Sequence, residues 1–117
     1  MNSKIGSDFE KRVVAKFAAK GYWVHFFAPD SRGAQPFDII VVKNGEVKAV
    51  ECKTCEKPFF SILRLQENQI AAFEKWGLCG NPEPIVLVEH IGKIYIVPYT
   101  WLKMRGKVRL EDCTIWE

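Results

Sequence analysis

The stretch that decides the fold is residues 36–53, which read PFDIIVVKNGEVKAVECK. Two runs rich in Val and Ile flank Asn44–Gly45, and this dipeptide is the strongest short-range signal for a β-hairpin with a two-residue turn. Such a turn sets the register, because it pairs Lys43 with Glu46 and thereby fixes every pair that follows. The sequence therefore predicts two antiparallel strands, over residues 37–43 and 46–53.

The same register brings charged side chains together at the open end of the hairpin. Counted from the turn, Asp38 is predicted to lie directly opposite Glu51, with Cβ atoms roughly 5 Å apart. Lys53 is two positions beyond Glu51 and projects from the same face. Two opposed carboxylates destabilise a sheet unless their charge is compensated. A divalent cation that prefers oxygen ligands, Mg²⁺ or Mn²⁺, would compensate it, while the alternatives are Lys53 alone or simple solvation of surface charges.

The rest of the chain predicts helices around this hairpin. Ile5, Phe9, Val13 and Phe17 recur every four residues, and Gly21 follows as a helix stop. The predicted elements besides the hairpin are helices over residues 3–20 and 65–76, strands over residues 22–28, 85–90 and 93–97, and a helical turn over residues 99–105. This order predicts an α/β fold with a mixed central β-sheet flanked by helices. With 117 residues, the chain is expected to form a single domain over residues 1–117.

Composition narrows the class of protein. Hydrophobic residues make up 48% of the chain and charged residues 26%, which excludes a disordered or collagen-like chain. No apolar run approaches the ~20 residues of a membrane span, and the N-terminus has no apolar signal region, so a cytoplasmic protein is expected. Residues 1–64 carry 11 Lys or Arg against 7 Asp or Glu, whereas residues 65–117 carry 6 against 7. The basic first half favours a polyanionic partner.

The four cysteines leave a competing interpretation open. Cys52 and Cys55 form a CxxC pair, but Cys79 and Cys113 stand alone, so the spacing of a zinc ribbon is absent. Thiol redox chemistry or an iron–sulfur cluster at the pair is one alternative, and four reduced thiols acting as small hydrophobic residues is the other. The predicted hairpin places Cys52 on the face opposite Glu51, which argues against a joint role with the carboxylates.

The motif Phe37-Asp38, twelve residues, then Glu51-Cys52-Lys53 resembles that of the PD-(D/E)XK nuclease superfamily. The resemblance implies a restriction-endonuclease-like core (α-β-β-β-α-β) and metal-dependent hydrolysis of phosphodiesters, leaving 5′-phosphate and 3′-hydroxyl ends. It implies that Asp38 and Glu51 hold one or two Mg²⁺ ions, replaceable by Mn²⁺, together with the backbone carbonyl of Cys52. Lys53 would then orient the attacking water or stabilise the developing negative charge.

Two further residues match catalytic positions of the resembled family. Glu10 matches the acidic residue of the helix before the core and is expected to reach the metal directly or through water. Its alternative role is a capping box with Ser7 as N-cap, although the apolar periodicity extends the helix before Ser7. Gln69 falls on the apolar stripe of the predicted helix with Leu65 and Phe73, and it matches a family Gln that points at the active site. Its alternative is a partly exposed helix residue.

The covered part, roughly residues 4–90, is similar in particular to the small archaeal-type Holliday junction resolvases. The loop Ser31-Arg32-Gly33 resembles the one that these enzymes place beside the active site, although ordinary turn chemistry around Gly33 explains it equally well. The residues expected to contact the DNA backbone are Lys4, Lys11, Arg12, Ser31, Arg32, Lys57 and Arg64.

The sequence thus favours a Mg²⁺-dependent, structure-specific DNA endonuclease that resembles Holliday junction resolvases and acts on branched or four-way DNA as a homodimer, in recombination or repair. The alternatives are a restriction, repair or phage-type nuclease that cuts ordinary duplex, and a catalytically inactive nucleic-acid-binding module. Competent residue types at every matched position argue against the inactive module.

Overall fold

A six-stranded mixed sheet, in the order β1-β2-β3-β5-β6-β8, forms the centre of the molecule. The computed structural model describes residues 3–27 and 36–117, and for residues 3–7 it describes the backbone alone. The strands of the sheet are β1 (Trp23–Phe26), β2 (Ile39–Lys43), β3 (Glu46–Thr54), β5 (Ile85–His90), β6 (Lys93–Pro98) and β8 (Thr114–Ile115). Strands β3 and β5 pair in parallel, and the other neighbours pair antiparallel. The α/β fold with a mixed sheet is confirmed.

The hairpin of β2 and β3 has the predicted register, from Lys43 opposite Glu46 to Ile39 opposite Val50. Its turn residues Asn44 and Gly45 have φ angles of 53° and 80°. Positive φ at both central residues is the signature of a type I′ turn, which Asn-Gly tolerates at little cost. The sequence at the turn therefore accounts for the pairing of the two strands.

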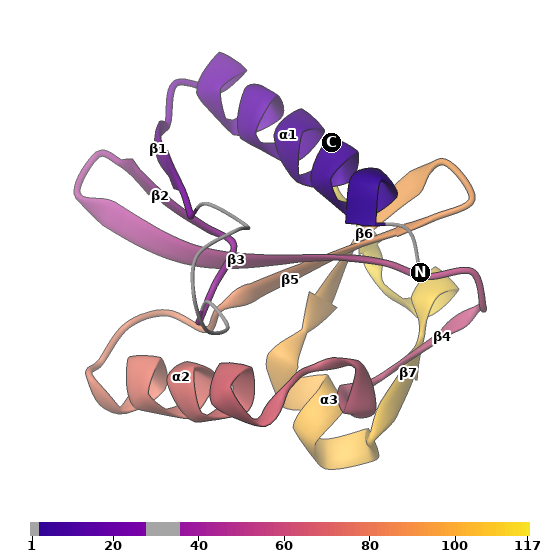
Figure 1. The fold of residues 1–117 in the computed structure, drawn as a ribbon. Helices are drawn as coiled ribbons and strands as arrows, with labels where there is room; N and C mark the ends of the chain where they lie inside the picture. The colour runs from indigo at the N-terminus through magenta and orange to yellow at the C-terminus, as the bar shows by residue number, and fades with distance from the viewer. Residues whose placement is uncertain (1–2, 28–35) are drawn as a thin grey trace.

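Helices cover both faces of the sheet (Figure 1). Helix α1 (Ser3–Ala19) lies on one face, while α2 (Glu67–Leu78) and α3 (Tyr99–Arg105) lie on the other. The periodic residues of α1 are buried with alternate residues of β2 and β3 in a core cluster that includes Phe9, Val13, Phe17, Val41 and Val50. The second cluster joins α2 and α3 to the opposite face of the sheet through residues that include Phe37, Ala49, Phe73, Val86 and Leu102.

The second half of the chain contains short elements that the sequence did not predict. Strands β4 (Phe59–Ser61) and β7 (Lys107–Arg109) form a separate antiparallel pair, and two 3₁₀ turns span Ile62–Arg64 and Leu110–Asp112. Strands of two or three residues are too short to show a period of two, so their sequence gives no signal. The strand predicted over residues 22–28 is shorter in the structure, where β1 spans Trp23–Phe26. The helix predicted over residues 65–76 begins and ends two residues later in the structure. Within the described residues, no helix is long and apolar enough to cross a bilayer.

Candidate active site

Asp38 lies just before β2 and differs from its predicted position. The ladder ends at Ile39 opposite Val50, and the backbone N–H of Asp38 also donates to the Val50 carbonyl at 3.1 Å. Asp38 is therefore not a ladder partner of Glu51, because the chain departs from the regular register one residue before the strand begins. Its carboxylate instead reaches across the open end of the hairpin, where Oδ2 accepts the backbone N–H of Cys52 at 2.8 Å. Because Cys52 is the neighbour of Glu51, this contact still brings the Asp38 carboxylate close to Glu51, as predicted.

Glu51 lies in the second half of the central strand β3 and is 1% exposed. Its Oε2 atom accepts the side-chain amide of Gln69 at 2.6 Å and lies 3.5 Å from the Lys53 ammonium. Its Oε1 atom is buried and has no hydrogen-bond partner among the described residues. A buried carboxylate oxygen without a partner is costly, so this atom marks a position where a cation or water would be stabilising.

Gln69 is the residue of α2 that reaches the sheet. Its Oε1 atom accepts the backbone N–H of Gln66 at 3.0 Å, in the first turn of the helix. Because that contact uses the amide oxygen, the NH₂ group is left to face Glu51. The prediction that Gln69 lies on the buried face of its helix, next to the carboxylates, is confirmed, and the partly exposed alternative is wrong, since the residue is buried.

Glu10 lies on α1, which covers the face of the sheet opposite to α2, and it approaches the two carboxyls of Asp38 and Glu51 from there. The helix begins at Ser3, so Ser7 lies within it and the capping-box alternative is wrong. Burial and then the charge of Asp38 raise the pKa of Glu10 to about 7, and Lys53 opposes this effect. Glu10 therefore lies within electrostatic reach of both Asp38 and Lys53.

Burial favours the neutral form of both central carboxyls. Burial is the main cause that raises the pKa of Glu51 to about 8, and the charge of Asp38 adds to it, whereas Lys53 and Gln69 act in the opposite direction. Burial also raises the pKa of Asp38, against the hydrogen bond from Cys52 and the charge of Lys53. Lys53 alone thus fails to compensate the negative charge. Additional positive charge at this point would favour both ionised carboxylates.

The donor set fits a hard cation with few protein ligands. No cluster of three or more His, Cys, Asp or Glu side chains that could hold a metal ion occurs in the described part of the chain, so Glu10 is not shown to be a third direct ligand. Mg²⁺ commonly uses one or two carboxylates and keeps several waters. Asp38 and the free oxygen of Glu51 meet that requirement. In an extended strand, the N–H and C=O of a residue point to the same side, so the Cys52 carbonyl points to the side on which its N–H meets Asp38.

The predicted DNA-contacting residues fall into three groups. Lys11 and Lys57 are exposed. Arg64 is exposed too, but its guanidinium donates to the Thr54 carbonyl at 2.8 Å at the end of β3. Arg12 forms two contacts with Glu89 of β5, at 2.6 and 3.0 Å, so its guanidinium is paired with a carboxylate, and its contact with DNA stays a prediction. Sequence reasoning missed Glu89, since no local signal links residues 77 positions apart. The Lys4 side chain, Ser31 and Arg32 lie outside the described residues.

The cysteine pair does not form a common site. Cys52 packs in the core cluster under α1, whereas Cys55 packs in the cluster under α2 and α3. The Cys55 thiol contacts the carbonyl oxygens of Lys57 and Phe59 at 3.2 and 3.3 Å. Burial is the main cause that raises the pKa of the Cys52 thiol well above its usual range. Both thiols are free and buried, which agrees with their use as small hydrophobic residues.

Comparisons with known proteins point in the same direction as the site. A family model described as archaeal Holliday junction resolvase (Hjc) matches residues 1–111. Among solved structures, the chain is similar to the Holliday junction resolvase Hjc of Archaeoglobus fulgidus, with a TM-score of 0.69 and 14% identity over 91% of this chain and 90% of that one. It is also similar to I-Ssp6803I, a bacterial homing endonuclease, with a TM-score of 0.58 and 14% identity over 90% of this chain and 71% of that one. No protein of curated function matches the chain in sequence.

Proposed function

Because the chain belongs to the archaeal Holliday junction resolvase family, we propose that it is a Mg²⁺-dependent endonuclease that hydrolyses phosphodiester bonds in four-way DNA junctions. The observation that carries the metal dependence is the buried Oε1 atom of Glu51, which lies beside a second carboxylate and has no partner in the part of the chain that the structure describes. Mn²⁺ is expected to replace Mg²⁺, since both prefer oxygen ligands.

Each residue of the candidate site has a role in this proposal. Asp38, Glu51 and the Cys52 carbonyl would hold the cation, and Glu10 would act through a water. When bound, the cation would lower the pKa of a water and neutralise charge on the phosphate. Lys53, whose side chain is 19% exposed, is placed to orient the attacking water or to stabilise the charge that develops on the phosphate.

Gln69 would act as a positioning residue. It donates to Glu51 Oε2 and thereby leaves Oε1 as the oxygen that faces a ligand. Partners that orient a metal ligand in this way commonly change metal affinity or activity 10- to 100-fold when they are removed.

The DNA backbone would be contacted by exposed cations around the site. Lys11, Lys57 and Arg64 are suitably exposed, and Lys4, Ser31 and Arg32 remain candidates from the sequence. Arg12 would have to exchange Glu89 for a phosphate. Two copies of the chain would be needed to cut two strands, so we expect a homodimer, which sedimentation velocity would detect as a doubled mass.

Cleavage of three labelled substrates tests the function. A four-way junction, a plain duplex of the same sequence and a single strand are incubated with the protein and Mg²⁺, with Lys53→Ala in parallel. Paired nicks in the junction alone, absent in Lys53→Ala, are the expected result. Equal cutting of the plain duplex would replace junction resolution with a restriction or repair activity. Tight junction binding without cleavage in Mg²⁺ or Mn²⁺ would indicate an inactive binding module.

A further inference from the structure

The turn between β5 and β6 carries an unusual residue. Ile91 and Gly92 have φ angles of 46° and 74°, and the strands that they join pair His90 with Lys93. This is the same type I′ geometry as the Asn44–Gly45 turn. Asn adopts positive φ readily, whereas a β-branched residue does so at a cost in strain. At equivalent positions, one hairpin thus has the preferred residue and the other has Ile91.

Packing does not account for Ile91. Its side chain is 83% exposed, and it belongs to neither core cluster. An apolar side chain that is strained in its backbone and exposed to water contributes little to stability. Backbone strain of this kind is found most often at functional sites.

The base of this hairpin is held firmly. The backbone N–H of Cys55 donates to the Glu89 carbonyl at 2.9 Å, and Nδ1 of His90 contacts the Cys55 carbonyl at 2.9 Å. The Glu89 side chain is also paired with Arg12 of α1. These contacts connect the end of β5 to the residue that follows β3 and to α1. The β5–β6 turn therefore projects from a part of the molecule that is held in place.

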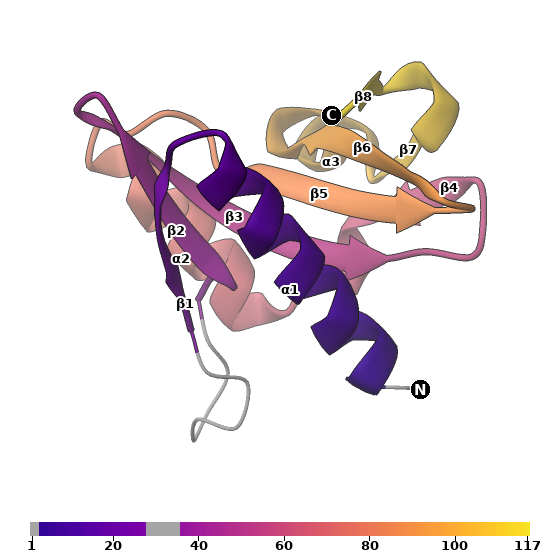
Figure 2. The same cartoon turned by 90° about the horizontal axis from the view of Figure 1, so that it is seen from above.

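The tip lies at the same end of the molecule as the candidate active site. Lys53 of β3 pairs with Val88 of β5, and Ile91 is three residues further along. At about 3.3 Å per residue, the tip lies roughly 10 Å beyond Lys53 along the strand direction. Figure 2 shows the β5–β6 turn beside the connection from β3 to β4.

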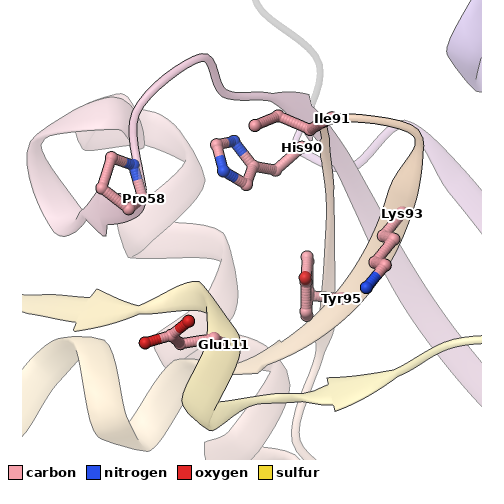
Figure 3. Close-up of a pocket in the computed structure, with 6 residues that line it drawn as sticks. All are labelled: Pro58, His90, Ile91, Lys93, Tyr95 and Glu111. Atoms are coloured by element: carbon pink, nitrogen blue, oxygen red, sulfur yellow. The ribbon is translucent and has the colours of Figure 1, made fainter.

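The surroundings of the tip favour contact with nucleic acid at the Ile91 side chain itself. Ile91 forms part of the rim of a cavity of about 220 Å³ that is also lined by Pro58, His90, Lys93, Tyr95 and Glu111 (Figure 3). The Glu111 carboxylate disfavours a phosphate inside this cavity. The exposed Lys93 next to the turn instead provides a cation for the backbone of a strand that passes over the tip.

We propose that Ile91 is a wedge that inserts between base pairs at the branch point of the DNA, next to the strand that is cut. Apolar side chains, Ile among them, open base steps in this way in other DNA-binding proteins. A branch point is the place where a base step is already incompletely stacked, so insertion there costs least. This inference rests on the proposed function, because it assigns the position of the branch relative to the catalytic residues.

Substitutions at Ile91 distinguish a role of this side chain in opening the DNA from a role in the stability of the fold. Ile91→Asn introduces the residue that the other type I′ turn uses, so its melting temperature is expected to rise. Its rate of junction cleavage is nevertheless expected to fall about tenfold or more, since the base step next to the cut strand is no longer held open. Ile91→Phe retains an apolar wedge and is expected to cleave within a fewfold of the wild type. Met104→Gln is the matched control, because Met104 on α3 is also 83% exposed and lies away from the site.

A second readout does not depend on cleavage. A junction with 2-aminopurine next to the branch point is titrated with the protein, and fluorescence is expected to increase with the wild type and Ile91→Phe but not with Ile91→Asn. The proposal that Ile91 inserts between base pairs is overturned if fluorescence is unchanged in all variants, or if Ile91→Asn cleaves within twofold of the wild type. The tip would then be a contact for protein. If the wild type cuts no substrate yet brightens the probe through Ile91, the cleavage proposal fails and the wedge stands.

Discussion

Among single residues, Glu51 is the one on which the proposed cation site depends most. One of its oxygens accepts a hydrogen bond from Gln69 and lies near Lys53, and the other is buried with no partner within the described ranges of the chain. The burial that raises the pKa of Glu51 to about 8 also raises that of Asp38. Neighbouring carboxyls with raised pKa values are a common feature of functional sites. Their proximity is explained by the contact between Asp38 and the Cys52 N–H.

We predict that cation binding at this pair releases protons. The pKa of Glu51 is about 8 and that of Glu10 about 7, so both carboxyls are partly protonated at pH 7 and must ionise to favour a cation. Titration calorimetry with Mn²⁺ in buffers of different ionisation enthalpy counts the released protons. The count is expected to fall in Glu51→Gln. A proton count of zero at pH 7 in the wild type would contradict this view of the site.

We predict that Gln69→Ala lowers the cleavage rate 10- to 100-fold while the chain remains folded. The substitution removes the donor to Glu51 Oε2 and frees that carboxylate to turn. Single-turnover cleavage at saturating enzyme measures the effect, with Mn²⁺ affinity as a second readout that a purely structural role would leave unchanged. Lys75→Ala, at an exposed position of the same helix, is the control. An unaltered Mn²⁺ affinity in Gln69→Ala would show that Gln69 does not orient the ligand.

At the scale of elements, α2 positions Gln69 through an aromatic cluster one turn further along the helix. The Phe73 ring stacks on Phe37 at 5.3 Å and meets Tyr99 edge-on at 4.9 Å. Phe37 directly precedes Asp38 in the sequence, so one cluster anchors both the helix of Gln69 and the start of β2. Phe37, which comes before the candidate metal ligand Asp38, is therefore a core residue.

We predict that Phe73→Ala destabilises the protein by about 3–5 kcal/mol, the usual cost of removing a buried Phe side chain. At roughly 4 °C per kcal/mol for a domain of this size, the melting temperature is expected to fall by more than 10 °C. Differential scanning calorimetry provides the measurement. Phe59→Ala is the comparison, because Phe59 is 38% exposed and its loss is expected to cost much less. Equal losses for both variants would mean that α2 is not anchored by this cluster.

At the scale of the whole molecule, the sheet carries the site between two helical layers. β3 contributes Glu51, Lys53 and the Cys52 backbone, α1 brings Glu10 over one face, and α2 brings Gln69 over the other (Figure 1). Packing on both faces makes the end of the hairpin a region of low solvent access. That low access is the cause of the raised carboxyl pKa values, so stability and function are coupled through pH.

We predict that, without divalent cations, the melting temperature falls as pH rises from about 5 to 9. A carboxyl whose pKa is higher in the folded than in the unfolded state contributes stability below its unfolded pKa, and this contribution is lost as pH rises through the folded value. The loss is expected between the ordinary carboxyl pKa of 4.5 and the raised values of about 7 for Glu10 and about 8 for Glu51, and the curve is expected to level off at higher pH. Calorimetry in EDTA measures the slope, Glu51→Gln should flatten it, and Mg²⁺ should raise the melting temperature most at high pH. A melting temperature that rises with pH in EDTA would contradict the prediction.

The hairpin register, the helix of Glu10, the buried face of Gln69 and the α/β class were all predictable from the sequence, because turn chemistry and apolar periodicity are local properties. The sequence also carried the resemblance to junction resolvases that the family comparison confirms. Three features became visible in the tertiary structure alone: Asp38 leaves the ladder, Arg12 is paired with Glu89, and β4 pairs with β7. The structure also showed that Ile91 has a strained backbone and an exposed side chain at a hairpin tip. The first three features depend on contacts between residues well separated in the chain, which no local pattern specifies, and the Ile91 turn departs from the local preference for Asn or Gly at its position.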